Sequence, residues 1–226
     1  MTLELRSISY RYPGYRRFAI EAIDLRVGDG EIVGLVGPNE AGKSTICLVA
    51  SGLAPASIGG ELTGDVVVDG VSLRGLPVHE LAGRVGIVFA NPASQLSGIA
   101  GTVLEEVAFG PVNLGLEVAE CVARVRAALT AVGIDDLAER RPDRLSGGQT
   151  QLVAIASMLA MRPRTLVLDE PVAELDPDGR RLVSEALHSL AGTGTALLVA
   201  EHDRELLASL GARIVEIHGG QLGVPA

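Results

Sequence analysis

Residues 37–45 read GPNEAGKST and directly follow an apolar run, Ile32-Val33-Gly34-Leu35-Val36. The spacing is glycine, four further residues, then Gly42, Lys43 and Ser44. Glycines allow several backbone N–H groups to turn toward one phosphate, and the N-terminus of a following helix favours the same anion. In this pattern the lysine reaches the β- and γ-phosphates of a nucleotide, and the serine hydroxyl can ligate Mg²⁺. We therefore predict a buried strand, a phosphate-binding loop and a helix over residues 43–50; the alternative is a glycine-rich turn without a ligand.

Lysine usage supports this interpretation. Lysine and arginine total 19, and Lys43 is the only lysine among them. An ammonium group is a compact point charge, so a chain that otherwise uses arginine retains lysine where the cation must fit among phosphates. The candidate nucleotide contacts in this loop are Gly37, Pro38, Asn39, Glu40, Ala41, Gly42, Lys43, Ser44 and Thr45.

The composition limits the class of partner. The formal net charge is −9, which argues against nucleic acid because its recognition usually needs a basic face. The length of 226 residues suits one large domain with a substantial core. The apolar runs are shorter than the ~18 residues of a membrane-spanning helix, so we expect no transmembrane segment. Cys47 and Cys121 lack metal-ligand spacing, and we expect both to be small buried residues.

The order of strand and helix patterns predicts an α/β fold. Short apolar runs before the phosphate loop and after Gly64 indicate an N-terminal antiparallel β layer. Apolar residues at three- and four-residue spacing over 117–132 indicate a helix. From Leu145 onward strands and helices alternate, which favours a mostly parallel sheet covered on both faces. The boundaries that these patterns suggest are a core over 1–89 and 145–226 and an inserted helical subdomain over 90–144, all within one domain, 1–226.

Two further motifs narrow the chemistry. The apolar strand Leu166-Val167-Leu168 ends in Asp169 and Glu170, although unpaired charge at the edge of a core is unfavourable. Mg²⁺ at the phosphate loop would compensate Asp169, and Glu170 can orient and activate water; alternatively, the pair only caps the sheet edge. The second motif, Leu145-Ser146-Gly147-Gly148-Gln149, supplies a hydroxyl and amides at a helix N-terminus, which favours a second anion site.

In combination, the phosphate loop, the acidic strand end and the 145–149 motif resemble those of the ATP-binding cassette ATPases, over nearly the whole chain. The resemblance implies a P-loop NTPase core of the RecA-like type, ATP hydrolysis, and Mg²⁺ held by Ser44 and Asp169. It also implies that Glu170 and His202 are catalytic. His202, in Ala200-Glu201-His202-Asp203, matches the histidine that contacts the γ-phosphate. Without the resemblance, His202 would be an ordinary polar residue at a strand end.

The same resemblance implies a head-to-tail dimer with two nucleotides at its interface. Asp176, in Ala173-Glu174-Leu175-Asp176, matches the loop that communicates across this interface. Tyr12, before Pro13 and Gly14, matches the aromatic residue that stacks on adenine; the alternative is a surface tyrosine on an edge strand. The residues expected to contact the ATP held by the second subunit are Ser146, Gly147, Gly148 and Gln149.

A finer resemblance points to the ATPase subunits of energy-coupling-factor importers, which take up vitamins and transition metals such as cobalt and nickel. It rests on residues 88–96, VFANPASQL, and on the downstream runs EEVAFGP (105–111) and NLGL (113–116). The resemblance implies integral membrane transporter subunits as partners and a peripheral location on the cytoplasmic face of the cell membrane. The transported substrate, and whether the second ATPase subunit is identical or different, stay open.

Two residues depart from the family pattern. Ala90 occupies the place of a glutamine that reaches Mg²⁺ and water. Either this site hydrolyses ATP slowly, or Gln95 substitutes; we favour the first, because the intervening loop contains Pro92. Glu40 stands where a small residue is usual, so its carboxylate must point away from the phosphates or weaken their binding.

Two other functions are alternatives to transport. The loop sequence GPNEAGKST also resembles that of chromosome-maintenance and repair ATPases, which act on DNA. Those proteins insert a long coiled coil between two ATPase halves, and this chain has no sustained heptad run. A soluble ATPase without membrane partners typically carries two cassettes in one chain, whereas this sequence carries one.

Overall fold

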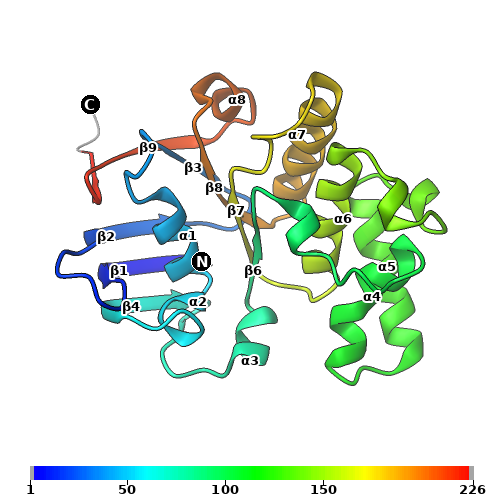
Figure 1. Cartoon of the computed structure of the whole chain (residues 1–226), viewed down its shortest axis with the longest axis horizontal. Coiled ribbons are helices and arrows are strands. Elements are labelled where there is room, and N and C mark those ends of the chain that lie inside the picture. Colours follow the sequence, from blue (N-terminus) through cyan, green and yellow to red (C-terminus); the bar gives the residue numbers. More distant parts are fainter. Residues whose placement is uncertain (1–2, 224–226) are drawn as a thin grey trace.

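The computed structural model describes residues 3–223, which form two β-sheets with helices packed around them (Figure 1). The smaller sheet is antiparallel in the order β2-β1-β4-β5, with β1 Leu3–Arg11, β2 Ile20–Val27, β4 Glu61–Val68 and β5 Val71–Ser72. The larger sheet has the order β10-β9-β3-β8-β7-β6, and only β10 runs antiparallel to its neighbour. Its strands are β3 Ile32–Val36, β6 Val85–Val88, β7 Thr165–Asp169, β8 Ala196–Glu201, β9 Arg213–His218 and β10 Gln221–Leu222. The predicted α/β architecture is therefore confirmed.

Helices lie on both faces of the larger sheet (Figure 1). On the side of the antiparallel layer are α1 Lys43–Ala50, α2 Leu53–Ala56 and α3 Val78–Ala82. On the other side are α4 Val103–Asn113, α5 Val118–Ala131, α6 Gly147–Leu159, α7 Pro177–Gly192 and α8 Arg204–Ser209. Single 3₁₀ turns occur at Pro92–Ser94, Asp135–Leu137 and Pro142–Arg144. The helices expected between residues 90 and 144 are α4 and α5, and the subdomain boundaries after residues 89 and 144 stay a prediction.

The larger sheet separates two hydrophobic cores. Successive side chains of a strand point to opposite faces. In β7, Val167 accordingly packs into the core under the antiparallel layer, while Leu166 and Leu168 pack into the core beneath α4 to α8. Because both faces are buried, the strands are almost continuously apolar, which explains why their sequences do not alternate with polar residues.

Helix α4 is longer than the sequence pattern indicated. The sequence pattern indicates a helix from Thr102 to Phe109, whereas α4 also includes Pro111, which lacks an N–H and usually ends or kinks a helix. It continues to Asn113 because Val103, Val107 and Pro111 lie four residues apart and are all buried. Burial of this apolar stripe outweighs the missing backbone hydrogen bond.

Strand β4 also begins earlier than expected, at Glu61, because it pairs with β1 as far as Arg11. Cys47 and Cys121 are buried free thiols, as predicted. Within residues 3–223 no helix is both long and apolar enough to cross a membrane.

Candidate active site

The phosphate-binding loop connects the buried strand β3 to α1, as expected. Gly42 has a φ of 108°, a conformation that side-chain-bearing residues rarely adopt, and α1 begins at the next residue. A Cβ on Gly42 would also lie 2.8 Å from a side-chain carbon of Ile20. The side chain of Lys43 is 5% exposed, and its ammonium donates to the carbonyls of Gly37 (2.9 Å) and Pro38 (3.2 Å). The loop thus holds its lysine in one place, over the start of α1.

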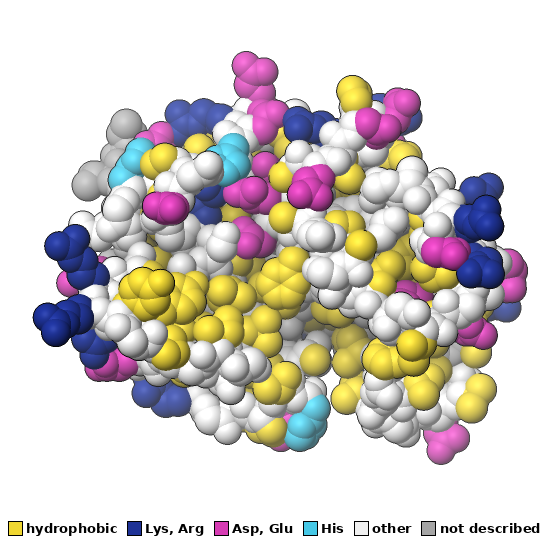
Figure 2. Space-filling view, viewed as in Figure 1, with side chains coloured by type: hydrophobic (Ala, Val, Ile, Leu, Met, Phe, Trp, Pro, Cys, Tyr) yellow, Lys and Arg dark blue, Asp and Glu magenta, His cyan; other side chains and the backbone are white. Residues whose placement is uncertain are grey.

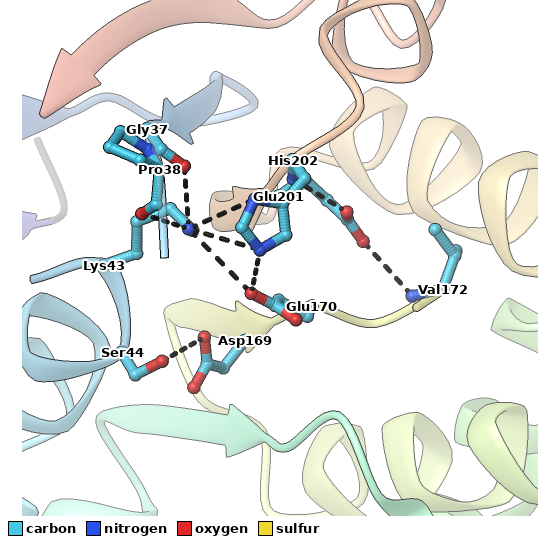
Figure 3. A network of polar contacts seen from close by, with 9 residues as sticks. All are labelled: Gly37, Pro38, Lys43, Ser44, Asp169, Glu170, Val172, Glu201 and His202. Carbon is cyan, nitrogen blue, oxygen red and sulfur yellow. Dashed lines mark hydrogen bonds and ion pairs between the residues drawn. The ribbon is translucent and has the colours of Figure 1, made fainter. Parts of the chain in front are cut away.

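The two acids at the end of β7 face this loop (Figure 3). The Oγ of Ser44 donates to Oδ1 of Asp169 at 3.1 Å. Burial raises the pKa of Asp169, and the hydrogen bond from Ser44 only partly offsets this effect. Glu170 follows with a φ of 52°, held by a hydrogen bond from its N–H to the Ala200 carbonyl (2.9 Å). The positive φ turns the chain sharply as it leaves the sheet.

His202 completes the cluster from the end of β8. Its Nε2 lies 2.7 Å from Oε1 of Glu170, and the ammonium of Lys43 lies 3.9 Å from the same oxygen (Figure 3). The Lys43 ammonium is also 3.4 Å from Nε2 of His202. The carboxyl ends of parallel strands meet at one edge of a sheet, so β3, β7 and β8 bring a cation, a carboxylate and an imidazole together there.

The chemistry of the oxygens at this edge fits a divalent cation. The Ser44 hydroxyl and the Asp169 carboxylate converge, and burial raises the pKa of Asp169, so a cation bound there would favour its charged form. Mg²⁺ typically uses one or two protein oxygens together with substrate phosphates rather than a full protein cage. Ser44 and Asp169 are therefore suited to hold Mg²⁺ beside a nucleotide.

A cavity of about 840 Å³ opens beside the loop. Tyr12 lines it, which fits the predicted contact with adenine, but the Tyr12 hydroxyl lies 3.2 Å from Oγ1 of Thr45. Its ring meets those of Tyr10 and Tyr15 edge to face, at 4.9 and 6.3 Å between centroids. Glu40 lies exposed in the wall, at a φ of 62°. The lining residues not foreseen from the sequence are Tyr15, Arg17, Phe18, Ala19, Gly219 and Gly220.

Comparisons with known proteins identify the family. A family model described as ABC transporter matches residues 20–173, more than half of the chain. The chain belongs to the ABC transporter family. It is therefore an ABC-type ATPase, the ATP-binding subunit of a transporter.

Individual relatives agree with this assignment. The energy-coupling factor transporter ATP-binding protein EcfA of Methanosphaera stadtmanae is 42% identical over 207 residues, which cover 91% of this chain and 72% of that protein. The structure of cbiO1 from Clostridium perfringens, described as part of the ABC transporter complex cbiONQ, superposes with a TM-score of 0.86 at 29% identity and covers 99% of this chain and 87% of its own. A dimeric ATP-binding cassette with bound ADP and Pi has a TM-score of 0.79 at 26% identity, covering 98% and 97%.

The 145–149 motif of this ABC ATPase lies away from the cavity, at the start of α6. Ser146 and Gln149 form a reciprocal cap: the Ser146 hydroxyl accepts from the N–H of Gln149, and Oε1 of the Gln149 side chain accepts from the N–H of Ser146. Ser146 and Gly147 are exposed, whereas Gly148 is buried. Asp176 is exposed too, and caps α7 by accepting from the N–H of Gly179 at 2.8 Å, as its Asp-Pro sequence predicts. The exposed residues Ser146, Gly147 and Asp176 are therefore accessible to a second molecule.

Ala90 and Gln95 also have defined places in the ABC ATPase. Ala90 follows the end of β6 and is half-buried. Gln95 accepts a hydrogen bond from the N–H of Phe89 (3.1 Å) and donates one to the carbonyl of Ile87 (2.7 Å). Both ends of its side chain amide are thus engaged by the β6 segment, in agreement with the preferred interpretation that Gln95 does not replace the missing glutamine.

Glu201, for which the sequence predicts no role, lies directly behind the cluster. It is the last residue of β8 and is 3% exposed. A carboxylate at the end of an apolar strand was the signal that could have identified it, as it was for Asp169.

Proposed function

We propose that this ABC ATPase powers an importer of the energy-coupling-factor type, for a vitamin or a transition-metal ion. The convergence of Glu170, His202 and Lys43, with a 2.7 Å contact between the first two, is the observation that carries the catalytic part. The type of importer is supported by similarity to EcfA, named an energy-coupling factor transporter ATP-binding protein, and to cbiO1, described as part of the ABC transporter complex cbiONQ. The substrate would be selected by another subunit.

Each residue of the cluster has a distinct task. Lys43 binds the β- and γ-phosphates of ATP, since its buried ammonium is already fixed by loop carbonyls. Glu170 orients the attacking water and accepts its proton. His202 contacts the γ-phosphate and, through its 2.7 Å contact, holds the Glu170 carboxylate in place. Mg²⁺, held by Ser44 and Asp169 beside the phosphates, would neutralise charge that develops during the reaction.

Two copies of the cassette, or this chain and a related one, would form a head-to-tail dimer. In it the exposed Ser146 and Gly147, with Gly148 and Gln149, would contact the ATP of the opposite subunit, and Asp176 would lie at the interface. The N-terminus of α6 suits this task because its N–H groups favour an anion. A dimeric cassette with ADP and Pi among the similar structures supports this arrangement. Tyr12 would stack on adenine from the cavity wall.

A membrane subunit would dock on the helical part of the molecule. Hydrophobic side chains border a hollow between α3 and the α4–α5 pair (Figure 2). Exposed apolar residues on α4 and α5 are Phe109, Val112, Val118 and Val122. Exposed apolar side chains that gather on one surface commonly mark a protein interface. The subunit would then sit at the cytoplasmic face of the membrane, with 90–144 as the helical subdomain that transmits movement, and without nucleic acid as a partner.

Exchange of Glu170 for Gln tests the catalytic assignment. The amide retains the shape of the side chain but cannot accept the proton of water, so Glu170→Gln should bind ATP like the wild type and lose hydrolysis. We expect the bound ATP to hold two molecules together as a dimer in size-exclusion chromatography. Normal turnover by this variant would show that Glu170 is structural.

A second experiment tests the transport role. Extraction from native membranes in mild detergent should recover the subunit with integral membrane proteins, and recovery without them would contradict the transport role.

A further inference from the structure

Glu201 connects two separate loops of the active site. Its Oε1 accepts a hydrogen bond from the N–H of Val172 at 3.3 Å, and its Oε2 accepts one from the N–H of His202 at 3.1 Å (Figure 3). The side chain is 3% exposed, so water does not compete for these oxygens. One carboxylate therefore joins the backbone N–H groups of Val172 and His202, which are 30 residues apart in the sequence.

The two N–H groups belong to the segments that carry Glu170 and His202. Val172 lies two residues after Glu170, in the segment that leaves β7. On its other side Glu170 is held by its own N–H bond to the Ala200 carbonyl, next to Glu201. The backbone around Glu170 is thus fixed to the end of β8 at two points. Because the Glu170 and His202 side chains meet at 2.7 Å, a shift of either segment would change that contact.

A carboxylate suits this position better than a neutral side chain. It has two acceptor oxygens and no hydrogen, whereas a glutamine would turn an NH₂ group toward one of the N–H donors. The position is unfavourable in itself, because burial raises the pKa of Glu201 and the nearby charge of Glu170 raises it further. An apolar side chain would pack equally well at this position of β8, so the carboxylate of Glu201 indicates a specific role.

We propose that Glu201 is a positioning residue for ATP hydrolysis, which sets the separation between Glu170 and His202 by holding the backbone of both loops. The proposal rests on the catalytic roles of Glu170 and His202 proposed above. It concerns turnover rather than nucleotide binding, because the Lys43 ammonium is held by carbonyls of its own loop and not by Glu201.

Exchange of Glu201 for Gln tests the proposal with a matched control. Glu106 is also a buried carboxylate, 4% exposed, whose two oxygens accept from the backbone N–H and the hydroxyl of Ser97. Glu106→Gln therefore removes one acceptor from a similar two-bond site outside the cluster. We expect Glu201→Gln to lower the Tm by about 2–10 °C, and Glu106→Gln to lower it by no more than this, because the Ser97 hydroxyl can also accept from an NH₂ group. Only Glu201→Gln should lower kcat, by about 10- to 100-fold, because a small misplacement of reacting groups is sufficient.

The readouts separate positioning from general loss of structure. ATP affinity, measured by nucleotide titration, should stay within about twofold of the wild type in Glu201→Gln, since the phosphate loop is unchanged. An unchanged kcat, or an equal loss of kcat in Glu106→Gln, would overturn the proposal. A loss of ATP affinity that accounts for the whole effect would overturn it as well. Turnover by Glu170→Gln would instead contradict the proposed catalytic role, independently of Glu201.

A measurement on the wild type keeps the proposal testable even if Glu201→Gln does not fold. The amides of Val172 and His202 lie in loops, yet both are bonded to a buried carboxylate. Hydrogen exchange should therefore show both protected to the same degree as the amides at the end of β8. Exchange of either amide at the rate of an open loop would refute the proposal that Glu201 holds the backbone of both loops.

Discussion

Gly148 at the start of α6 and Gly179 at the start of α7 contact each other backbone to backbone. A Cβ on Gly148 would lie 2.6 Å from the Cα of Gly179, and a Cβ on Gly179 would lie 3.3 Å from the Cα of Gly148. The N–H of Gly179 is also the donor to the capping carboxylate of Asp176. The first turns of two helices that we assign to the dimer interface are therefore packed as one unit, and Gly148 is needed for this packing apart from any contact with ATP.

Two glycines of α7 should respond in opposite directions to exchange for alanine. Alanine stabilises a helix by up to about 1 kcal/mol relative to glycine. At Gly192 a Cβ would have no neighbour within 4 Å, so Gly192→Ala should show this gain. At Gly179 a Cβ would lie 2.9 Å from Oδ1 of Asp176 as well as against Gly148, so Gly179→Ala should lose about 1–3 kcal/mol.

Urea denaturation of both variants measures these free energies of unfolding. Gly179→Ala should in addition weaken the ATP-dependent dimer, because it displaces the start of α6 from that of α7. Equal stabilisation of the two variants would show that the glycine contact carries no constraint.

Much of the site was accessible from the sequence because its residues stand at strand ends. Asp169 and His202 lie at the ends of apolar strands, Lys43 lies on the loop that leaves a third such strand, and parallel strands bring these ends together. The contact between Gly148 and Gly179 was not accessible, since the reason for each glycine lies in the other helix. Glu201 stands out as a carboxylate at a strand end, but the bond that it accepts from the N–H of Val172 could not be predicted from the sequence. Local patterns report what a residue prefers, but not which distant backbone group it meets.

The ion pair of Glu31 predicts a dependence of stability on pH. The Glu31 carboxylate accepts from Arg213 Nε and from Gly28 N, both at 2.7 Å, and so joins the turn before β3 to β9. Burial raises the pKa of Glu31, but the bonds from Arg213 and Gly28 outweigh it and lower the pKa below its ordinary 4.5. A lowered pKa means that the folded state favours the carboxylate. The stabilisation is then fully present above pH 4.5 and disappears as the pH falls through the folded-state value.

Comparison with Glu31→Gln isolates this contribution. The wild type should exceed the variant in free energy of unfolding at pH 7, and the difference should shrink at pH values below 4.5. Urea titrations at several pH values provide the measurement. In an Arg213→Gln background the dependence should be weaker, because the largest favourable partner is gone. A difference that grows on acidification would contradict the assignment.

The last prediction concerns Ala90, whose methyl group cannot ligate Mg²⁺ or hold a water molecule. Gln95 is not free to replace the missing glutamine, because its amide is bonded to both Phe89 and Ile87. The site should therefore hydrolyse ATP slowly with Ser44, Asp169, Glu170 and His202 alone. Ala90→Gln should raise the basal ATPase rate of the purified subunit, by up to about tenfold, since a placed side chain can orient the attacking water.

Gln95→Ala is the matched variant for this prediction. It removes two hydrogen bonds at the end of β6 and should cost about 1–3 kcal/mol of stability, with little effect on the turnover of the folded protein. Steady-state ATPase rates, measured well below the Tm of each variant, compare the two side chains directly. If Gln95→Ala lost its activity while Ala90→Gln gained none, Gln95 would have to leave its bonds to Phe89 and Ile87 during the reaction. The slow-site interpretation would then be wrong.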